Sequence, residues 1–133
     1  MRVMIDSNVI ISAIYNPKSK PASVLSHVCE NHDLVLCDHI ITECYDVVKR
    51  KFPQHLQFLD KLFATLGYEL VATPRTGIVM PDPKDSPILN ASILADVDVV
   101  ISGDGHFLSL SIEHPEILAP AHYLDKYGLE LRK

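Results

Sequence analysis

The chain has 133 residues, of which 47% are hydrophobic and 22% are charged. This length suits one domain with a single buried core, and we expect that domain to span residues 1–133. The apolar content excludes a disordered chain, and no charge-free stretch reaches the roughly 18 residues that a membrane span needs. The net charge of −5 is opposite in sign to a basic nucleic-acid footprint. Contact with nucleic acid would therefore need metal ions to reverse the local field.

The cysteine content bears on the cellular compartment. The chain has three cysteines, which cannot all pair within one molecule. The apolar N-terminal segment resembles a secretory signal, but Asp6 and Asn8 interrupt it. We therefore expect a cytoplasmic protein with free, buried thiols at Cys29, Cys37 and Cys44. A zinc site is disfavoured because the spacing of these cysteines to nearby histidines fits no common zinc finger.

The N-terminal half alternates short apolar runs with helical patterns. A strand is predicted at Arg2–Ile5, and helical segments follow at Val9–Ile14 and Pro21–Glu30. Leu34–Cys37 is an apolar run of strand length. His39–Lys51 carries apolar residues at intervals of three and four, which is typical of an amphipathic helix.

The pattern continues after that helix. Gln54–Leu66 is a second amphipathic helix, with Gly67 as its predicted C-terminal cap. Tyr68–Ala72 is a third strand candidate, and the proline-rich segment Thr73–Pro87 is a predicted loop. A helix is predicted over Pro87–Ala95, where the proline falls in the first turn and its missing N–H matters least.

The C-terminal part supplies the remaining strands. Asp98–Ser102 is strongly strand-like, and a short helix near His106–Leu110 follows. The tail is predicted to hold a short strand at Ile117–Leu118, a helix and one last strand. Continuous Val/Ile/Leu strands separated by helices indicate a parallel sheet covered on both faces. We therefore expect a three-layer α/β fold, with a central, mostly parallel sheet, helices on both faces and right-handed crossovers.

Carboxylates stand where the predicted strands end, which is where ligands bind in open parallel sheets. Asp6 follows the first strand, Glu43 lies in the first turns of the helix after the second, and Asp104 follows the fourth. Asp85 lies near the end of the proline-rich loop, just before the predicted helix Pro87–Ala95. Each acid alone is most simply a helix cap, a turn residue or a solvated side chain. Together they would repel one another, and a hard divalent cation such as Mg²⁺ or Mn²⁺ would relieve that repulsion.

Four sequence blocks around these acids resemble, in order, those of the PIN-domain family, in its VapC-like toxin branch. The blocks are MIDSNVIISA, HIITECYDVV, PDPKDSPILNASI and DVVISGDGHFLSL. The resemblance covers nearly the whole length. It implies a Mg²⁺- or Mn²⁺-dependent endoribonuclease whose catalytic and metal-binding residues are Asp6, Glu43, Asp85 and Asp104. Many relatives carry further acids where this chain has Ser86 and His106, which bears on whether a second metal ion binds.

Other residues are assigned supporting roles in that mechanism. Asn8 and Ser102 are candidates for orienting the carboxylates or a metal-bound water, with turn residue and helix cap as equal alternatives. Glu43 or Asp85 could accept a proton from the attacking water. Candidate contacts to the RNA are the lysines Lys18, Lys20 and Lys84, in loops near the predicted site, together with His106.

Two other functions stay open at this point. One is a silent PIN-like domain that binds RNA or a protein partner without cutting, although none of the four acids is missing. The other is a receiver- or phosphatase-like phosphotransfer domain with Asp6 as phosphoacceptor, although Ser7 and Asn8 supply no second acid. The resemblance also implies an antitoxin partner and a homodimer.

Overall fold

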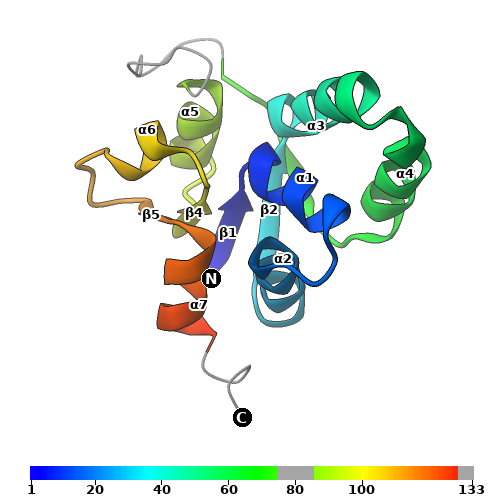
Figure 1. Ribbon diagram of the computed structural model, residues 1–133. Coiled ribbons are helices and arrows are strands. Elements are labelled where there is room, and N and C mark those ends of the chain that lie inside the picture. The colour runs from blue at the N-terminus through cyan, green and yellow to red at the C-terminus, as the bar shows by residue number, and fades with distance from the viewer. Residues whose placement is uncertain (75–85, 129–133) are drawn as a thin grey trace.

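The structure is a computed structural model that describes residues 1–74 and 86–128 (Figure 1). Its strands are β1 (Arg2–Ile5), β2 (Asp33–Cys37), β3 (Glu69–Val71), β4 (Val99–Ile101) and β5 (Glu116–Leu118). Its helices are α1 (Ser7–Tyr15), α2 (Lys20–Asn31), α3 (Asp38–Lys51), α4 (Leu56–Thr65), α5 (Ser86–Leu94), α6 (Gly105–Leu108) and α7 (Pro120–Tyr127), with a 3-10 turn η1 (Pro53–His55).

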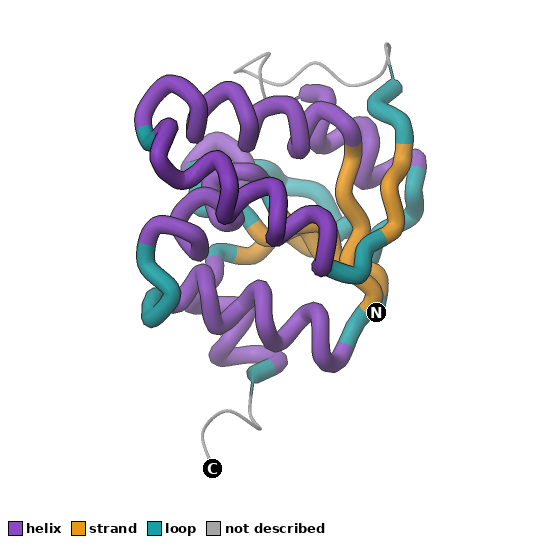
Figure 2. Tube along the Cα trace, turned by 90° about the vertical axis from the view of Figure 1, so that its right-hand side faces the viewer, coloured by secondary structure: helices purple, strands orange, loops and turns teal. Residues whose placement is uncertain are grey.

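The strands form one sheet in the order β3-β2-β1-β4-β5, and every pairing is parallel. After the charged first residues Arg2 of β1 and Asp33 of β2, the three central strands are apolar and buried, as expected for strands that helices cover on both faces. Val3, Met4 and Ile5 of β1 are each 0% exposed. Figures 1 and 2 show the helices on both sides of the strands. The predicted three-layer α/β fold is confirmed, and the sheet is entirely parallel within the described residues.

The helices that connect the strands also pack against one another. Helix α1 packs against α2 and α3, and α2 also contacts α7 near the end of the described chain. The core is one continuous cluster that includes residues from β1, β2 and β4. Since parallel strands end at a common edge, this arrangement brings the segments after β1, β2 and β4 to the same end of the sheet.

The predicted helix 54–66 differs from the observed one at both ends. The chain first makes the 3-10 turn Pro53–His55, and α4 then begins at Leu56. Gly67 is not the cap: Leu66 caps α4 in an extended conformation, and its N–H donates to the carbonyl of Leu62 at 2.8 Å. The chain leads directly into β3 from there, so no left-handed glycine is needed. The predicted final strand lies outside the described residues.

The predicted thiol environments are only partly confirmed. Cys37 and Cys44 are buried in the core, but Cys29 on α2 is exposed, so burial was wrongly predicted for it. All three are free thiols in the described structure. Across residues 1–74 and 86–128, no helix is both long and apolar enough to cross a membrane.

Candidate metal centre

The ends of β1 and β4 bring Asp6 and Ser102 together. In the sheet, Ile5 lies beside Ile101, and the next residues continue this register because the Asp6 N–H donates to the Ile101 carbonyl at 2.9 Å. The Ser102 hydroxyl then donates to Oδ2 of Asp6 at 2.8 Å. Two residues 96 positions apart in the sequence are therefore joined by strand register alone.

Asp6 is both a helix cap and a buried acid. Its Oδ1 accepts the Ser7 backbone N–H at 2.7 Å, which caps α1 and starts that helix two residues before the predicted Val9. The Asn8 amide donates to Oδ2 at 3.3 Å. Asp6 is only 2% exposed. Burial raises the pKa of this carboxyl, hydrogen bonds from Ser102 and Ser7 partly offset the effect, and the charge of Glu43 adds to it.

Glu43 reaches the same place from α3, which follows β2. The Ser7 hydroxyl donates to Oε1 of Glu43 and also lies 3.4 Å from Oδ1 of Asp6. Ser7 therefore bridges the two acids, a role that the sequence analysis missed. The signal for it was its place directly after Asp6 at a strand end. Among the described residues, no lysine or arginine forms an ion pair with Asp6 or Glu43.

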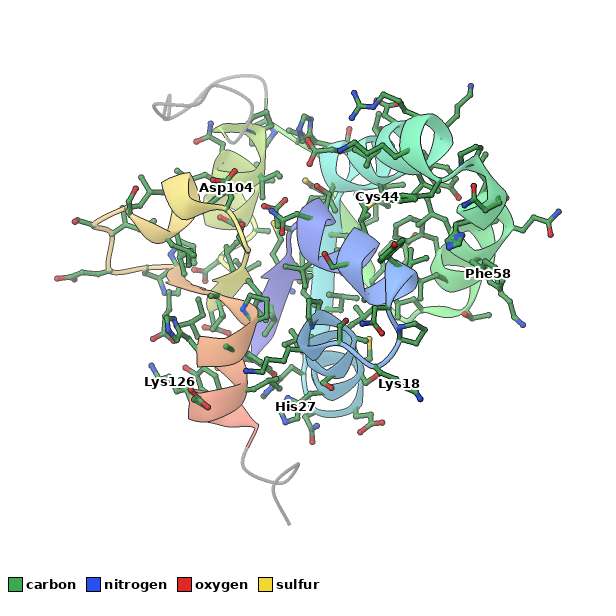
Figure 3. All side chains as sticks on the ribbon, viewed as in Figure 1. Lys18, His27, Cys44, Phe58, Asp104 and Lys126 are labelled. Carbon is green, nitrogen blue, oxygen red and sulfur yellow. The ribbon has the colours of Figure 1, made fainter. Side chains whose placement is uncertain are left out.

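The loop after β4 brings in Asp104. Its backbone N–H donates to the Ser102 hydroxyl at 3.0 Å, and the Gly103 N–H donates to the Asn8 side-chain oxygen at 3.1 Å. These bonds hold the loop against the start of α1, and Figure 3 shows Asp104 at this end of the sheet. Ser102 and Asn8 thus each form hydrogen bonds both to Asp6 and to the loop that carries Asp104. An orienting role requires such a geometry.

The remaining predicted site residues are not brought to this place by the described structure. Asp85 and Lys84 lie outside the described residues, and so does the side chain of His106. Lys18 lies beyond the far end of α1, about 13 Å of helix from Asp6, and Figure 3 shows it well away from Asp104. Lys20 is the first residue of α2 and not part of a loop. The prediction that both lysines sit in loops near the edge of the site is therefore only partly right: Lys18 lies in a turn, but α1 carries that turn away from the acids, and Lys20 lies in a helix.

The donor set at this centre suits a hard divalent cation. It consists of carboxylates and hydroxyls, the oxygen ligands that Mg²⁺ and Mn²⁺ prefer. The orienting hydrogen bonds from Ser7 and Ser102 are of the kind that holds ligands around a metal. Over the two described ranges, no group of three or more Asp, Glu, His or Cys side chains forms a complete metal cluster. The described part therefore supplies a pair of neighbouring acids, Asp6 and Glu43, with Asp104 in the adjoining loop.

Comparison with known proteins gives the family. The family model of the PIN domain matches residues 2–106, and the chain therefore belongs to the PIN-domain family. Its fold is similar to that of a chain in the crystal structure of VapBC2 from Rickettsia felis bound to a DNA fragment from their promoter. The TM-score is 0.64 at 16% sequence identity, and the match covers 89% of this chain and 97% of that one. No curated protein matches the sequence significantly. The predicted resemblance is confirmed in family and fold.

Proposed function

We propose that the protein is a Mg²⁺- or Mn²⁺-dependent endoribonuclease, the toxin of a toxin–antitoxin pair, built as one PIN domain over residues 1–133 and acting in the cytoplasm. The observation that carries the proposal is the Asp6–Glu43 pair. Asp6 is almost fully buried, and its pKa is raised by burial and by the charge of Glu43. Within residues 1–74 and 86–128, the groups that hydrogen-bond to it are hydroxyls and amides. A divalent cation would supply positive charge that no described lysine or arginine provides there.

The proposed roles follow from position. Asp6, Glu43, Asp85 and Asp104 would hold the metal, which when bound activates a water and stabilises the charge that develops on the phosphodiester. Ser7 and Ser102 keep the Asp6 and Glu43 carboxylates in fixed orientations, so that little reorganisation is needed during the reaction. Glu43 or Asp85 would accept the proton of the attacking water.

RNA binding is the less defined part of the proposal. Lys84 and His106 stay candidates for contact with the substrate. Lys18 and Lys20 stay candidates only for a part of the RNA that extends past α1. The phosphotransfer alternative is disfavoured by geometry, since Ser7 and Asn8, where a second acid would be needed, are already hydrogen-bonded to Asp6.

We propose that the antitoxin binds at a surface away from the acids. A cavity of about 400 Å³ lies between α1, α2 and α4. Its walls include Ile14, Leu25 and Leu62, and Phe58 at its rim is 63% exposed (Figure 3). An apolar helical segment of a partner would fit such a groove. The structural neighbour, which was crystallised as a VapBC complex, supports this choice of partner.

A homodimer is also proposed, and light scattering of the purified chain tests it.

Two substitutions test the nuclease proposal. Asp6→Asn and Asp104→Asn should each lower RNA cleavage in Mg²⁺ or Mn²⁺ by about 100-fold or more, because each removes a charged metal ligand. Asp96→Asn is the matched control: Asp96 is exposed after α5 with a φ of 53°, a conformation that asparagine also tolerates. Unchanged cleavage in both variants contradicts the proposal. A wild type that binds RNA and never cuts it supports the silent-domain alternative.

The antitoxin surface has its own test. Phe58→Asp should relieve inhibition by the cognate antitoxin and leave cleavage by the free enzyme unchanged. Leu94→Asp on α5, where the side chain is 72% exposed, is the control and should leave inhibition intact. Equal inhibition of all three proteins places the antitoxin elsewhere.

A further inference from the structure

The proposed mechanism gives no role to His39, whose side chain lies beside that of Glu43. The two residues are four apart on α3, so they share one face of the helix. Nε2 of His39 lies 3.7 Å from Oε2 of Glu43, which is too long for a hydrogen bond. The other carboxylate oxygen, Oε1, accepts from Ser7. The imidazole therefore faces the one oxygen of Glu43 that Ser7 does not occupy.

The first turn of α3 is fixed in a way that holds this imidazole in place. The preceding Cys37 supplies no side-chain cap. Instead, Oγ1 of Thr73 accepts the His39 backbone N–H at 3.2 Å, and the Thr73 N–H donates to Asp38 at 2.8 Å. The segment after β3 thus anchors the start of α3. His39 is held at the end of the sheet where Asp6 and Glu43 lie.

The Nε2 nitrogen of His39 is buried and makes no hydrogen bond to any described residue, and its contact with Glu43 is an ion pair only when the ring is protonated. The side chain as a whole is 34% exposed, yet Nε2 is shielded from solvent and makes no hydrogen bond in the described structure. Buried polar atoms nearly always have a hydrogen-bond partner, since a buried atom without one loses its hydrogen bonds to water and gains nothing in return. An imidazole nitrogen and a carboxylate oxygen 3.7 Å apart can share one metal ion, because two ligand bonds of about 2.1 Å span up to about 4.2 Å.

We propose that His39 is a nitrogen ligand that joins Glu43 at the metal centre and makes the centre prefer a transition-metal dication such as Mn²⁺ over Mg²⁺. The inference rests on the proposed function, which places a divalent ion at these acids. Both Mg²⁺ and Mn²⁺ take oxygen ligands readily, but Mg²⁺ gives up its waters reluctantly, and Mn²⁺, as a first-row transition metal, accepts an imidazole nitrogen more readily than Mg²⁺ does. Histidine and a carboxylate four residues apart on a helix form a chelate that needs no further folding to assemble.

The direct test is pulsed EPR of Mn²⁺ bound to the full chain. The wild type should show a directly coordinated ¹⁴N, and His39→Gln should lose that signal. In titrations, His39→Gln should bind Mn²⁺ about 10- to 100-fold more weakly, while Mg²⁺ affinity should change by less than about threefold. His122→Gln, on the exposed surface of α7, is the matched control and should behave as the wild type.

The outcomes separate this inference from the proposed function. If Mn²⁺ binds the wild type, is lost in Asp6→Asn and shows no ¹⁴N coupling, the His39 ligand is disproved and the nuclease proposal stands. Equal loss of Mg²⁺ and Mn²⁺ in a folded His39→Gln protein also disproves the selectivity. If Mn²⁺ does not bind the wild type at all, both fail. The wild-type spectrum is decisive even if His39→Gln does not fold.

Discussion

The two ends of the parallel sheet carry similar acids in opposite electrostatic settings. At the amino ends of the strands, the Arg2 guanidinium donates to both carboxylate oxygens of Glu69, at 3.1 and 2.7 Å. The Arg2 backbone N–H donates to Asp98 at 2.8 Å. At the carboxyl ends, Asp6 and Glu43 face each other across Ser7, and no described lysine or arginine pairs with either.

This difference separates an acid that is paired within the fold from acids whose charge no described lysine or arginine neutralises. The pKa of Glu69 is lowered by its hydrogen bonds to Arg2, so its charge is stabilised in the folded protein. The pKa of Asp6 is raised by burial and by Glu43, so its charge is disfavoured there. Carboxyls whose charge is disfavoured in the folded state cluster at functional sites, which supports the proposed metal centre at the carboxyl ends of the strands.

The largest expected effect compares one acid from each end. Glu43→Gln should lower RNA cleavage by about 100-fold or more, because it removes a charged ligand from the metal centre. Glu69→Gln, the same chemical change at the amino end, should leave cleavage within about twofold of the wild type. Single-turnover cleavage of a labelled RNA measures both. Equal losses in the two variants would remove the distinction between the two ends.

The second prediction concerns metal binding and stability. Mn²⁺ at about 100 times its Kd should raise the free energy of unfolding of the wild type by about 2.7 kcal/mol, since the ion binds only the folded state. Asp6→Asn should abolish this gain, and Glu69→Gln should keep it. Urea unfolding with Mn²⁺ and with EDTA supplies the comparison. A gain that survives in Asp6→Asn means that the ion binds elsewhere.

The third prediction concerns the amino end alone. Arg2→Met should lower the melting temperature slightly, because Glu69 and the Ala95 carbonyl both lose a partner at a solvent-exposed site. RNA cleavage by the folded fraction should not change. A thermal melt and a cleavage assay below the melting temperature test the two parts. Cleavage that falls with Arg2→Met would tie this end of the sheet to the catalytic reaction.

The smallest effect is a difference in pH dependence without metal. The folded-state pKa of Glu69 is lowered, so its stabilisation is present above its unfolded pKa of about 4.3 and is lost as the pH falls through the folded value. The folded-state pKa of Asp6 is raised, so stability is lost as the pH rises through it. At about pH 7, Glu69→Gln should thus be less stable than the wild type and Asp6→Asn more stable.

At low pH, the stability of each variant should approach that of the wild type. Urea unfolding in EDTA from about pH 7 down to about pH 3 follows this change, because below the folded pKa values the wild-type acids are as neutral as their amide replacements. If Asp6→Asn is less stable than the wild type at neutral pH, the charge of Asp6 does not destabilise the metal-free fold.

Much of this arrangement could be predicted from the sequence because strand patterns fix sheet ends. Apolar runs that end at Asp6 and Ser102 predict parallel strands, and parallel strands end side by side. The position of Ser7 directly after Asp6 places it at the same sheet end, but its bridge to Glu43 also depends on how α3 packs against α1, which strand patterns do not predict. His39 was visible only as a residue four before Glu43. The positions of Lys18 and Lys20 were mispredicted because the helix after β1 leads the chain back toward the amino ends of the strands.

The central claim is that a divalent ion binds between the acids at the carboxyl ends of the strands. An anomalous difference map from crystals soaked in Mn²⁺ tests it most directly. The account predicts a strong peak coordinated by Asp6 and Glu43, with Asp104 in contact directly or through water. Crystals at saturating Mn²⁺ whose only peaks lie elsewhere on the molecule would contradict it.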